Sequence, residues 1–248
     1  MSSDPTGNVD ERSTGGPLCN LDYMERYQAH LTKSLPPDLN ALTRFFAAPA
    51  RLKTLASILT KHFTGSGRRV LNAGCGPFAT ELFVSALQNQ EIESFDYTSG
   101  FAPLHAIFQN DGMITSTNFQ VADALSVEYP ENSFDLIIIH DVFYETGLPM
   151  DGLLRRFRPS LRSGGLVFFD FVNRRTEWLW RMLGSHHEFN RYDPDWVRQQ
   201  ISDLGYSIVE WRPTYGNSSL AKLAVHKLSE ILLRQSNGYA VLIQKNED

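Results

Sequence analysis

From Arg69 onward, strand-like and helix-like segments alternate along the chain, and this alternation constrains the fold more than any other feature. The strand-like segments are short apolar runs, and the segments between them carry apolar residues at three- and four-residue spacing. Strands separated by helices form parallel βαβ units, because a parallel neighbour is reached only through a long crossover. The pattern therefore predicts an α/β protein with a doubly wound, mostly parallel sheet.

The apolar runs predict seven strands and several helices. Residues 134–141 form a near-continuous apolar run, as expected of a central strand that is buried on both faces. A helix is expected to begin at Pro194, with Asp193 as its N-terminal cap. The expected strands are 69–73, 92–97, 118–122, 134–141, 165–171, 206–213 and 238–245. The expected helices are two or three within 21–63, and one each near 80–88, 102–109, 150–161, 194–205 and 218–234.

The composition favours one domain after a short tail. Residues 1–19 are polar and rich in Gly, Ser, Pro and Thr, so they are expected to be disordered. With 248 residues and 42% hydrophobic content, the chain can bury one sizeable core. We expect a single domain at 20–248, with a helical N-terminal cap (20–66), a central core (68–171) and a C-terminal part with helical insertions (172–248).

Charge and cysteine content narrow the classes of function. A net charge of −5 and a pI near 5.8 lack the basic footprint of proteins that bind nucleic acid or anionic membranes. Cys19 and Cys75 are too few for a disulfide framework, and no Cys/His cluster has metal-ligand spacing. No apolar run reaches the ~18 residues of a membrane span. We expect a cytoplasmic protein that acts on a small molecule, without a metal; its oligomeric state is left open.

A glycine turn joins the first expected strand to a helix, in the stretch RVLNAGCGPFATELF. Gly74 and Gly76 allow a sharp turn and close approach of a ligand, while the helix start offers unpaired N–H groups. A dinucleotide-binding G-x-G-x-x-G motif would have its third glycine at position 79, where this chain has Ala79. A tight turn without a ligand is the alternative.

Carboxylates follow the next strands at the same edge of the sheet. Asp96 ends the second strand, Asp123 follows the third, and His140 and Asp141 end the fourth. Doubly wound sheets bind ligands at the carboxyl ends of their strands, where a carboxylate 20 residues after the glycine turn can accept hydrogen bonds from ribose hydroxyls. Asp123 can accept a bond from an adenine amino group. As alternatives, each residue could cap a helix or end a solvated strand.

Residues 69–171 resemble the class I S-adenosylmethionine-dependent methyltransferases. The segments VLNAGCGPF, SFDYT, VADAL, SFDLIIIHDVFYE and LRRFRPSLRSGGLVFFDF are similar to successive family motifs. The resemblance implies a seven-stranded sheet with an antiparallel last strand, and S-adenosylmethionine lying across strands one to four. The donor-binding residues that it implies are Asn72, Ala73, Gly74, Gly76, Asp96, Tyr97, Asp123, Ala124, His140 and Asp141. Asn72 departs from the acidic residue that the family often has, and the helix expected at 218–234 replaces a short turn.

Methyl transfer needs mainly alignment of donor and nucleophile, and a base only when the acceptor must lose a proton. His140 is the first candidate base, with packing as the alternative, and Tyr144 the second catalytic candidate. Tyr144 and Glu145 could line an acceptor pocket or simply be exposed. Tyr27 is expected to contact the donor as part of an aromatic lid, or else to belong to the core.

The sequence offers further candidate site residues and alternative functions. Tyr23, Phe45 and Phe46 could belong to the same lid, and His186 and His187 could line the acceptor pocket. The residues do not show whether O, N or C is methylated. The alternatives are an enzyme that uses S-adenosylmethionine for a transfer other than methyl or for cyclisation, and a nicotinamide-dependent reductase.

Overall fold

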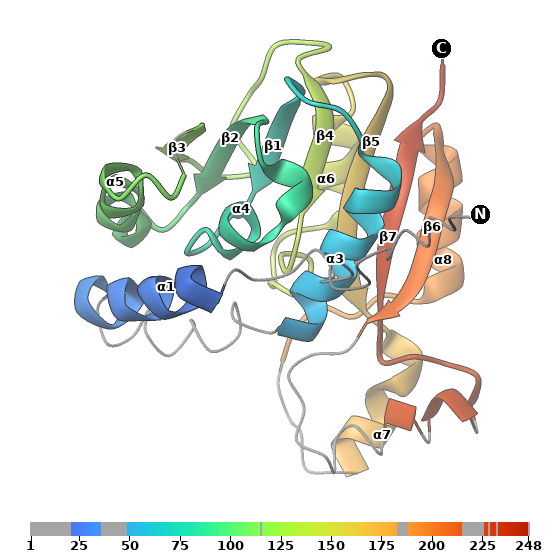
Figure 1. Ribbon diagram of the computed structural model, residues 1–248. Coiled ribbons are helices and arrows are strands. Elements are labelled where there is room, and N and C mark those ends of the chain that lie inside the picture. The colour runs from blue at the N-terminus through green and yellow to red at the C-terminus, as the bar shows by residue number, and fades with distance from the viewer. Residues whose placement is uncertain are drawn as a thin grey trace, which may run out of the picture.

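The computed structural model describes residues 21–35, 49–114, 116–182, 188–214, 226–227, 229–231 and 233–247 (Figure 1). Within these residues, seven strands form one sheet in the order β3-β2-β1-β4-β5-β7-β6. The strands are β1 (Arg69–Ala73), β2 (Glu91–Asp96), β3 (Thr117–Val121), β4 (Phe134–Ile139), β5 (Leu161–Val172), β6 (Tyr206–Thr214) and β7 (Gly238–Lys245). All seven predicted strands are therefore present.

Strand direction also follows the prediction. The pairs β1–β2, β2–β3, β1–β4 and β4–β5 are parallel, whereas β7 runs antiparallel to both of its neighbours, β5 and β6. In the dinucleotide-binding fold the strand order is 3-2-1-4-5-6, and no antiparallel strand lies between strands five and six. The mostly parallel sheet with an antiparallel last strand is thus confirmed, and it differs from the sheet of a nicotinamide-dependent reductase.

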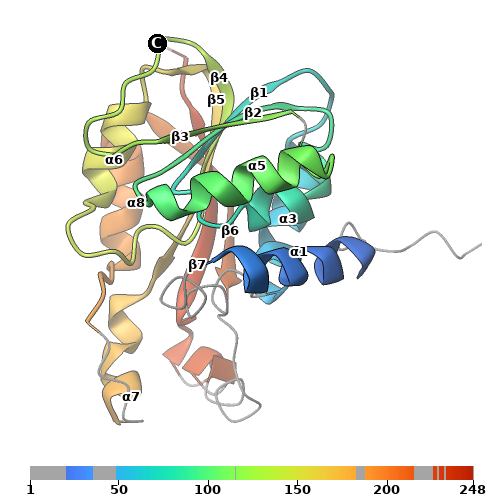
Figure 2. The ribbon, with the colours of Figure 1, turned by 90° about the vertical axis from the view of Figure 1, so that its left-hand side faces the viewer.

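Helices cover both faces of the sheet (Figures 1 and 2). One face is covered by α6 (Met150–Phe157) and α8 (Pro194–Asp203), and the other by α3 (Pro49–His62), α4 (Ala79–Phe83) and α5 (Ala102–Asn110). Helix α1 (Leu21–Ser34) packs against α5, through Tyr27 stacked on Phe108. Short 3-10 turns are η2 (Ser85–Leu87), η3 (Ser99–Phe101) and η4 (Arg174–Thr176).

Strand β4 shows how the sequence pattern builds the core. Ile137 and Ile139 pack on the α6 and α8 side, while Leu136 and Ile138 pack on the α3 side. All four side chains are fully buried. Successive strand residues face opposite sides of a sheet, so a strand with helices on both faces must be apolar throughout.

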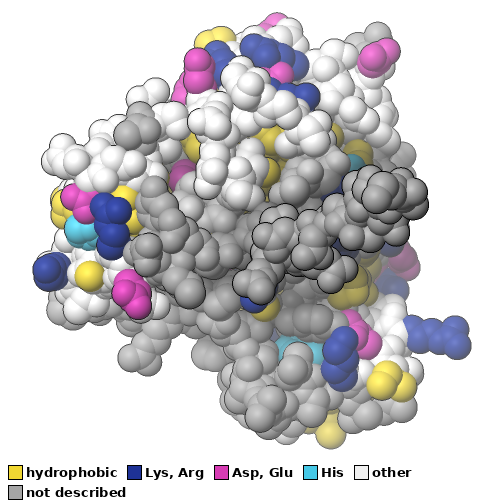
Figure 3. Space-filling model, viewed as in Figure 1, with side chains coloured by type: hydrophobic (Ala, Val, Ile, Leu, Met, Phe, Trp, Pro, Cys, Tyr) yellow, Lys and Arg dark blue, Asp and Glu magenta, His cyan; other side chains and the backbone are white. Residues whose placement is uncertain are grey.

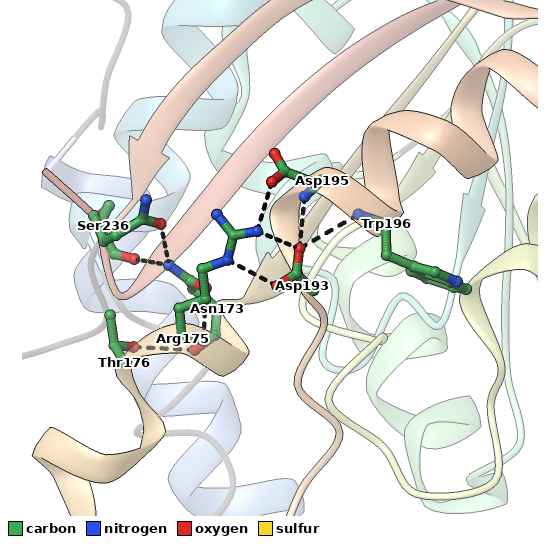
Figure 4. Close-up of polar contacts among 8 residues, drawn as sticks. Asn173, Arg175, Thr176, Asp193, Asp195, Trp196 and Ser236 are labelled. Carbon is green, nitrogen blue, oxygen red and sulfur yellow. Dashed lines mark hydrogen bonds and ion pairs between the residues drawn. The ribbon is translucent and has the colours of Figure 1, made fainter. Parts of the chain in front are cut away.

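The segment that leaves the sheet after β5 is held by polar side chains (Figure 4). Asp193 caps α8 by accepting from the backbone N–H groups of Asp195 and Trp196, as predicted. The Arg175 guanidinium donates to Asp193 at 2.7 and 2.8 Å. Buried Asn173 donates to the Ser236 carbonyl at 2.8 Å, which joins the end of β5 to the residues before β7.

Helix α7 (Glu177–Met182) and the described helical residues between 226 and 233 extend beyond the carboxyl end of β5 (Figure 1). Part of the helix expected at 218–234 is thereby seen. The helix expected at 80–88 is instead split: α4 ends at Phe83, Val84 is extended, and η2 follows. The split places Val84 and Leu87 in the apolar cluster beneath α3.

The expected tail lies outside the described residues. Acidic and basic side chains are interspersed over the described surface of the face shown in Figure 3, in keeping with the small net charge. None of the helices in the described part of the chain has the length and hydropathy needed to cross a membrane.

Candidate functional site

A cavity of about 530 Å³ opens at the carboxyl ends of β1, β2, β3 and β4. Small-molecule sites usually measure ~300–1,000 Å³, and open α/β sheets bind their ligands at this edge. Nine residues that the sequence analysis selected line the cavity: Ala73, Gly74, Asp96, Tyr97, Asp123, Ala124, Asp141, Tyr144 and Glu145. The fold has thus gathered at one place residues that lie up to 72 positions apart in the chain.

The glycine turn is joined to the end of β2 by backbone hydrogen bonds. The N–H groups of Gly74 and Cys75 both donate to the Phe95 carbonyl, at 2.9 and 3.0 Å. Gly74 has a φ of +73°, and a Cβ at this position would lie 2.6 Å from Cγ2 of Val142. Glycine is therefore required here by backbone conformation and by the close approach of the loop after β4.

Asp96 holds the turn in place and still faces the cavity. One carboxylate oxygen accepts from the Gly76 N–H at 3.0 Å, and the other accepts from the Thr98 N–H at 2.9 Å. Burial raises the pKa of Asp96, and these N–H bonds offset only part of the effect. Each carboxylate oxygen has two lone pairs, so Asp96 can accept further bonds from ligand hydroxyls.

Asp123 and Tyr97 lie nearer to the solvent. One Asp123 oxygen accepts from the Leu125 N–H at 2.9 Å, so this carboxylate also shapes its own turn. Its second oxygen has no hydrogen-bond partner among the described residues. The Tyr97 side chain lines the cavity while being 73% exposed, which places it at the mouth. Contacts of both residues with a donor stay predictions.

A buried charge cluster supports the far side of the cavity. The Arg51 guanidinium, from α3, lies 2.6 Å from a carboxylate oxygen of Asp141 and 2.6 Å from one of Asp170. Asp170 also accepts from the Asp141 N–H at 2.6 Å. Asp141 has a φ of +61°, a conformation that costs free energy in residues other than glycine. The cluster compensates for this cost and sets the position of the Asp141 carboxylate.

The charges in this cluster affect its two carboxyls in opposite directions. Burial acts to raise the pKa of Asp170, but the positive charge of Arg51 outweighs burial and holds the pKa below its usual range. For Asp141 burial prevails over Arg51, and the pKa is raised. Sequence reasoning missed Arg51, whose only signal is a cation beside the buried Leu52 and Leu55 of α3.

Asn72 differs from expectation, because its side chain does not line the cavity. Its amide is buried and donates to a Glu81 carboxylate oxygen at 2.7 Å, and the Ser94 hydroxyl donates to the same oxygen at 2.6 Å. Burial raises the pKa of Glu81, and the two hydrogen bonds offset part of the effect. A buried carboxyl group, that of Glu81 in α4, thus lies next to position 72.

His140 also lies away from the cavity lining. Strand alternation turns its ring to the α3 side, against Phe168 and 3.5 Å from the Thr80 hydroxyl. Burial lowers the pKa of His140, and its Nε2 has no hydrogen-bond partner among the described residues. The ring is therefore neutral at physiological pH, but this geometry favours the packing alternative over the base.

Tyr144 and Glu145 line the cavity in the loop after β4. This loop is held by Asn190, whose backbone N–H donates to the Tyr144 carbonyl at 2.8 Å and whose side chain donates to the Glu145 carbonyl at 2.6 Å. Burial raises the pKa of Tyr144 well above its usual range, with a further contribution from nearby Asp141. Tyr144 is therefore a neutral phenol, unsuited to act as a base. Sequence reasoning missed Asn190, and no motif marks it.

The expected aromatic lid is only partly described. The Tyr27 ring is fully buried, edge-on to Phe83 and stacked on Phe108, and is absent from the cavity lining. This placement matches the core alternative, because the amphipathic face of α1 turns toward α5. Phe45, Phe46, His186 and His187, and the side chain of Tyr23, lie outside the described residues. No cluster of metal-ligating side chains occurs among the residues that were described.

Residues 71–169 match the sequence model of a methyltransferase domain. This part of the chain is thus similar to a methyltransferase domain. Phosphoethanolamine N-methyltransferase 3 of Arabidopsis thaliana is 30% identical over 125 residues, which are 49% of this chain and 24% of that protein. This chain thus spans about a quarter of the length of that curated relative.

Solved structures support the same fold. Magnesium protoporphyrin IX methyltransferase (ChlM) from Synechocystis PCC 6803, with bound SAH, has a TM-score of 0.58 at 12% identity, over 91% of this chain and 94% of that one. The [4+2]-cyclase SpnF has a TM-score of 0.59 at 18% identity, over 79% and 81% of the two chains. The described chain therefore shares the fold of class I S-adenosylmethionine-dependent methyltransferases, as the sequence predicted.

Proposed function

We propose that this domain transfers the methyl group of S-adenosylmethionine to a small molecule. The observation that carries the proposal is the cavity at the ends of β1 to β4, where the glycine turn, Asp96 and Asp123 meet. The match to a methyltransferase domain supports it, as do the names of a similar protein, a phosphoethanolamine N-methyltransferase, and of a protein with the same fold, a magnesium protoporphyrin IX methyltransferase.

The residues present fit the donor. The carboxylate of Asp96 retains free lone pairs toward the cavity and would hold the ribose hydroxyls, and the second oxygen of Asp123 would accept from the adenine amino group. Gly74 leaves room for the amino-acid portion. When bound, S-adenosylmethionine supplies a methyl carbon activated by its sulfonium.

The protein's own contribution is the orientation of the reactants. The Arg51 cluster holds Asp141 at one wall, and Asn190 holds the loop that carries Tyr144 at another. Holding the reactants in the correct orientation lowers the free-energy barrier of a reaction, by ~7–11 kcal/mol in well-oriented cases. Because His140 faces away from the cavity and Tyr144 is a neutral phenol, we infer that neither removes a proton from the acceptor.

The proposal also covers the domain organisation of the chain, its cellular compartment and its partners. We infer one domain at 20–248, with acceptor-side walls from residues 172–248 beyond the carboxyl end of β5. We also infer a cytoplasmic setting, with no nucleic acid or membrane as partner. The small net charge supports the absence of these partners, and burial raises the pKa of the Cys75 thiol, which favours an inert, reduced cysteine.

Two measurements test the proposal. Calorimetry should show that S-adenosylhomocysteine binds and that NADH does not. Incubation of the protein with methyl-labelled donor and a cell extract should then place the label on a small molecule. Because a [4+2]-cyclase shares this fold, the second measurement is needed. Release of 5′-methylthioadenosine without a labelled product would instead show aminobutyryl chemistry, and tight NADH binding would contradict the proposal.

A further inference from the structure

Two polar groups on consecutive residues of the cavity lining are left unused by the fold. Among the described residues, the Tyr144 hydroxyl and the Glu145 carboxylate have no hydrogen-bond or ion-pair partner, although both residues line the cavity. The other carboxylates of the lining are engaged: Asp96 with two backbone N–H groups, Asp123 with one, and Asp141 with Arg51.

Glu145 and Tyr144 are held in place even though their polar ends are unused. Asn190 binds the carbonyls of both residues, and the Glu145 N–H donates to the Val142 carbonyl at 2.9 Å. Both side chains are half-buried, so the surrounding protein limits their freedom while the cavity gives access to them. A restrained but unpaired acceptor pair in a cavity is the arrangement expected of a ligand subsite.

The charge of the cavity selects the kind of ligand. Its described lining has four carboxylates and no Lys, Arg or His side chain. Arg51 lies behind Asp141 and forms ion pairs with both Asp141 and Asp170. The lining therefore keeps an excess of negative charge. Such a lining attracts a cationic group and repels a carboxylate or phenolate.

Resting on the proposed methyl transfer, we propose that Glu145 and Tyr144 form an acceptor subsite for an aliphatic amine, so that the domain is an N-methyltransferase. The ammonium group donates one N–H to the Glu145 carboxylate and another to the Tyr144 phenol oxygen. One proton leaves to water, which exposes the nitrogen lone pair. The nitrogen then forms a bond to the methyl carbon, the carbon–sulfur bond breaks, and its electron pair remains on sulfur.

The neutral state of Tyr144 fits this role. Burial and the carboxylates of Asp141 and Glu145 raise the pKa of its phenol, so the oxygen offers lone pairs without a second negative charge. One charged and one neutral acceptor suit an ammonium group that must later lose a proton, because two charged acceptors would hold the proton more firmly.

The test uses the whole protein, methyl-labelled donor and a panel of acceptors at equal concentration: ethanolamine, phosphoethanolamine, tyramine, p-cresol, butyrate and 2-mercaptoethanol. Label is expected on the nitrogen of at least one amine. Glu145→Gln should lower kcat/KM for that amine by about tenfold or more, since a charge-assisted hydrogen bond is lost. Glu145→Asp should recover part of the loss. Glu131→Gln is the matched control. Glu131 is exposed and precedes β4, so it lies at the amino ends of the parallel strands, away from the cavity.

Binding provides a readout besides activity. The protein is first saturated with S-adenosylhomocysteine. Glu145→Gln should then lower the affinity for the amine that the wild-type protein methylates by about fivefold or more. The affinity for S-adenosylhomocysteine itself should stay within about twofold, which shows that the donor half is intact. Label only on p-cresol, butyrate or 2-mercaptoethanol would overturn the amine assignment, as would full amine activity in Glu145→Gln. Label on a small molecule of a cell extract that is not an amine, with none on the three amines, would also overturn the amine assignment while leaving methyl transfer in place. No label on any molecule, in the panel or in the extract, would contradict methyl transfer itself.

Discussion

Replacing Arg51 with methionine removes the guanidinium that lies between Asp141 and Asp170 but keeps a long apolar stem in α3. The side chains of the three residues are 16%, 6% and 2% exposed, so the two carboxylates would be left buried without their cation. Breaking a buried pair from one side costs about 3–5 kcal/mol. Because domains are stable by only about 5–15 kcal/mol, this is a large fraction of the total.

The loss should depend on pH in a defined direction. In wild type, the lowered pKa of Asp170 contributes stability above the pKa of the unfolded chain, and this contribution is lost as pH falls. In the Arg51→Met variant, both carboxyls are expected to have raised pKa values, which destabilise the fold as pH rises through them. The difference between the two proteins should therefore be largest above about pH 7 and shrink toward about pH 4.

Urea unfolding followed by circular dichroism between these pH values measures the difference. Arg162→Met is the matched control, because Arg162 is 46% exposed in its pair with Asp135 and its loss should cost only about 0–1 kcal/mol. Should Arg51→Met fail to fold, Asp170→Asn keeps an oxygen for the Asp141 N–H and should cost less, about 1–3 kcal/mol. A pH-independent loss below 1 kcal/mol in Arg51→Met would refute the reasoning.

Three further predictions concern Asp96 in the cavity lining and the buried residues Glu81 and Tyr27. Asp96→Asn should weaken S-adenosylhomocysteine binding by ~1–3 kcal/mol in calorimetry, because a charged acceptor is lost, and should lower stability because one backbone N–H loses its acceptor. Glu81→Gln should be more stable than wild type by ~1 kcal/mol near pH 8 and less so near pH 5, since burial raises the pKa of Glu81 and its charged form is costly at high pH. Tyr27→Phe should be neutral or stabilising by up to ~1 kcal/mol, because the buried hydroxyl has no hydrogen-bond partner among the described residues, and donor affinity should not change.

Each of these has a contrary result. Unchanged affinity in Asp96→Asn would place the ligand elsewhere. A Glu81→Gln protein less stable than wild type at high pH would show that the charge itself is required. Weaker donor binding in Tyr27→Phe, measured in a protein of unchanged stability, would restore Tyr27 to the donor site.

The predicted strands and the actual ones agree because strand signals are local. The seven apolar runs lie within a few residues of the observed strands, and Asp193 and Pro194 mark the start of α8 as predicted. The glycine turn and the residues after β2, β3 and β4 meet at one edge because parallel strands all end there. The candidate cavity could thus be located from the sequence alone.

The sequence alone therefore determined the strands, the parallel βαβ units and the edge that carries the cavity, since hydrophobic periodicity and turn residues act over short stretches. The antiparallel last strand followed from the resemblance to the methyltransferases. Only the tertiary structure decided which side chains face that cavity. Arg51 meets Asp170 across 119 positions, and Asn190 holds Glu145 across 45. His140 turns away from the cavity, whereas Glu145 lines it with a carboxylate that has no partner among the described residues. Such pairings depend on how distant segments pack, and no local pattern records them.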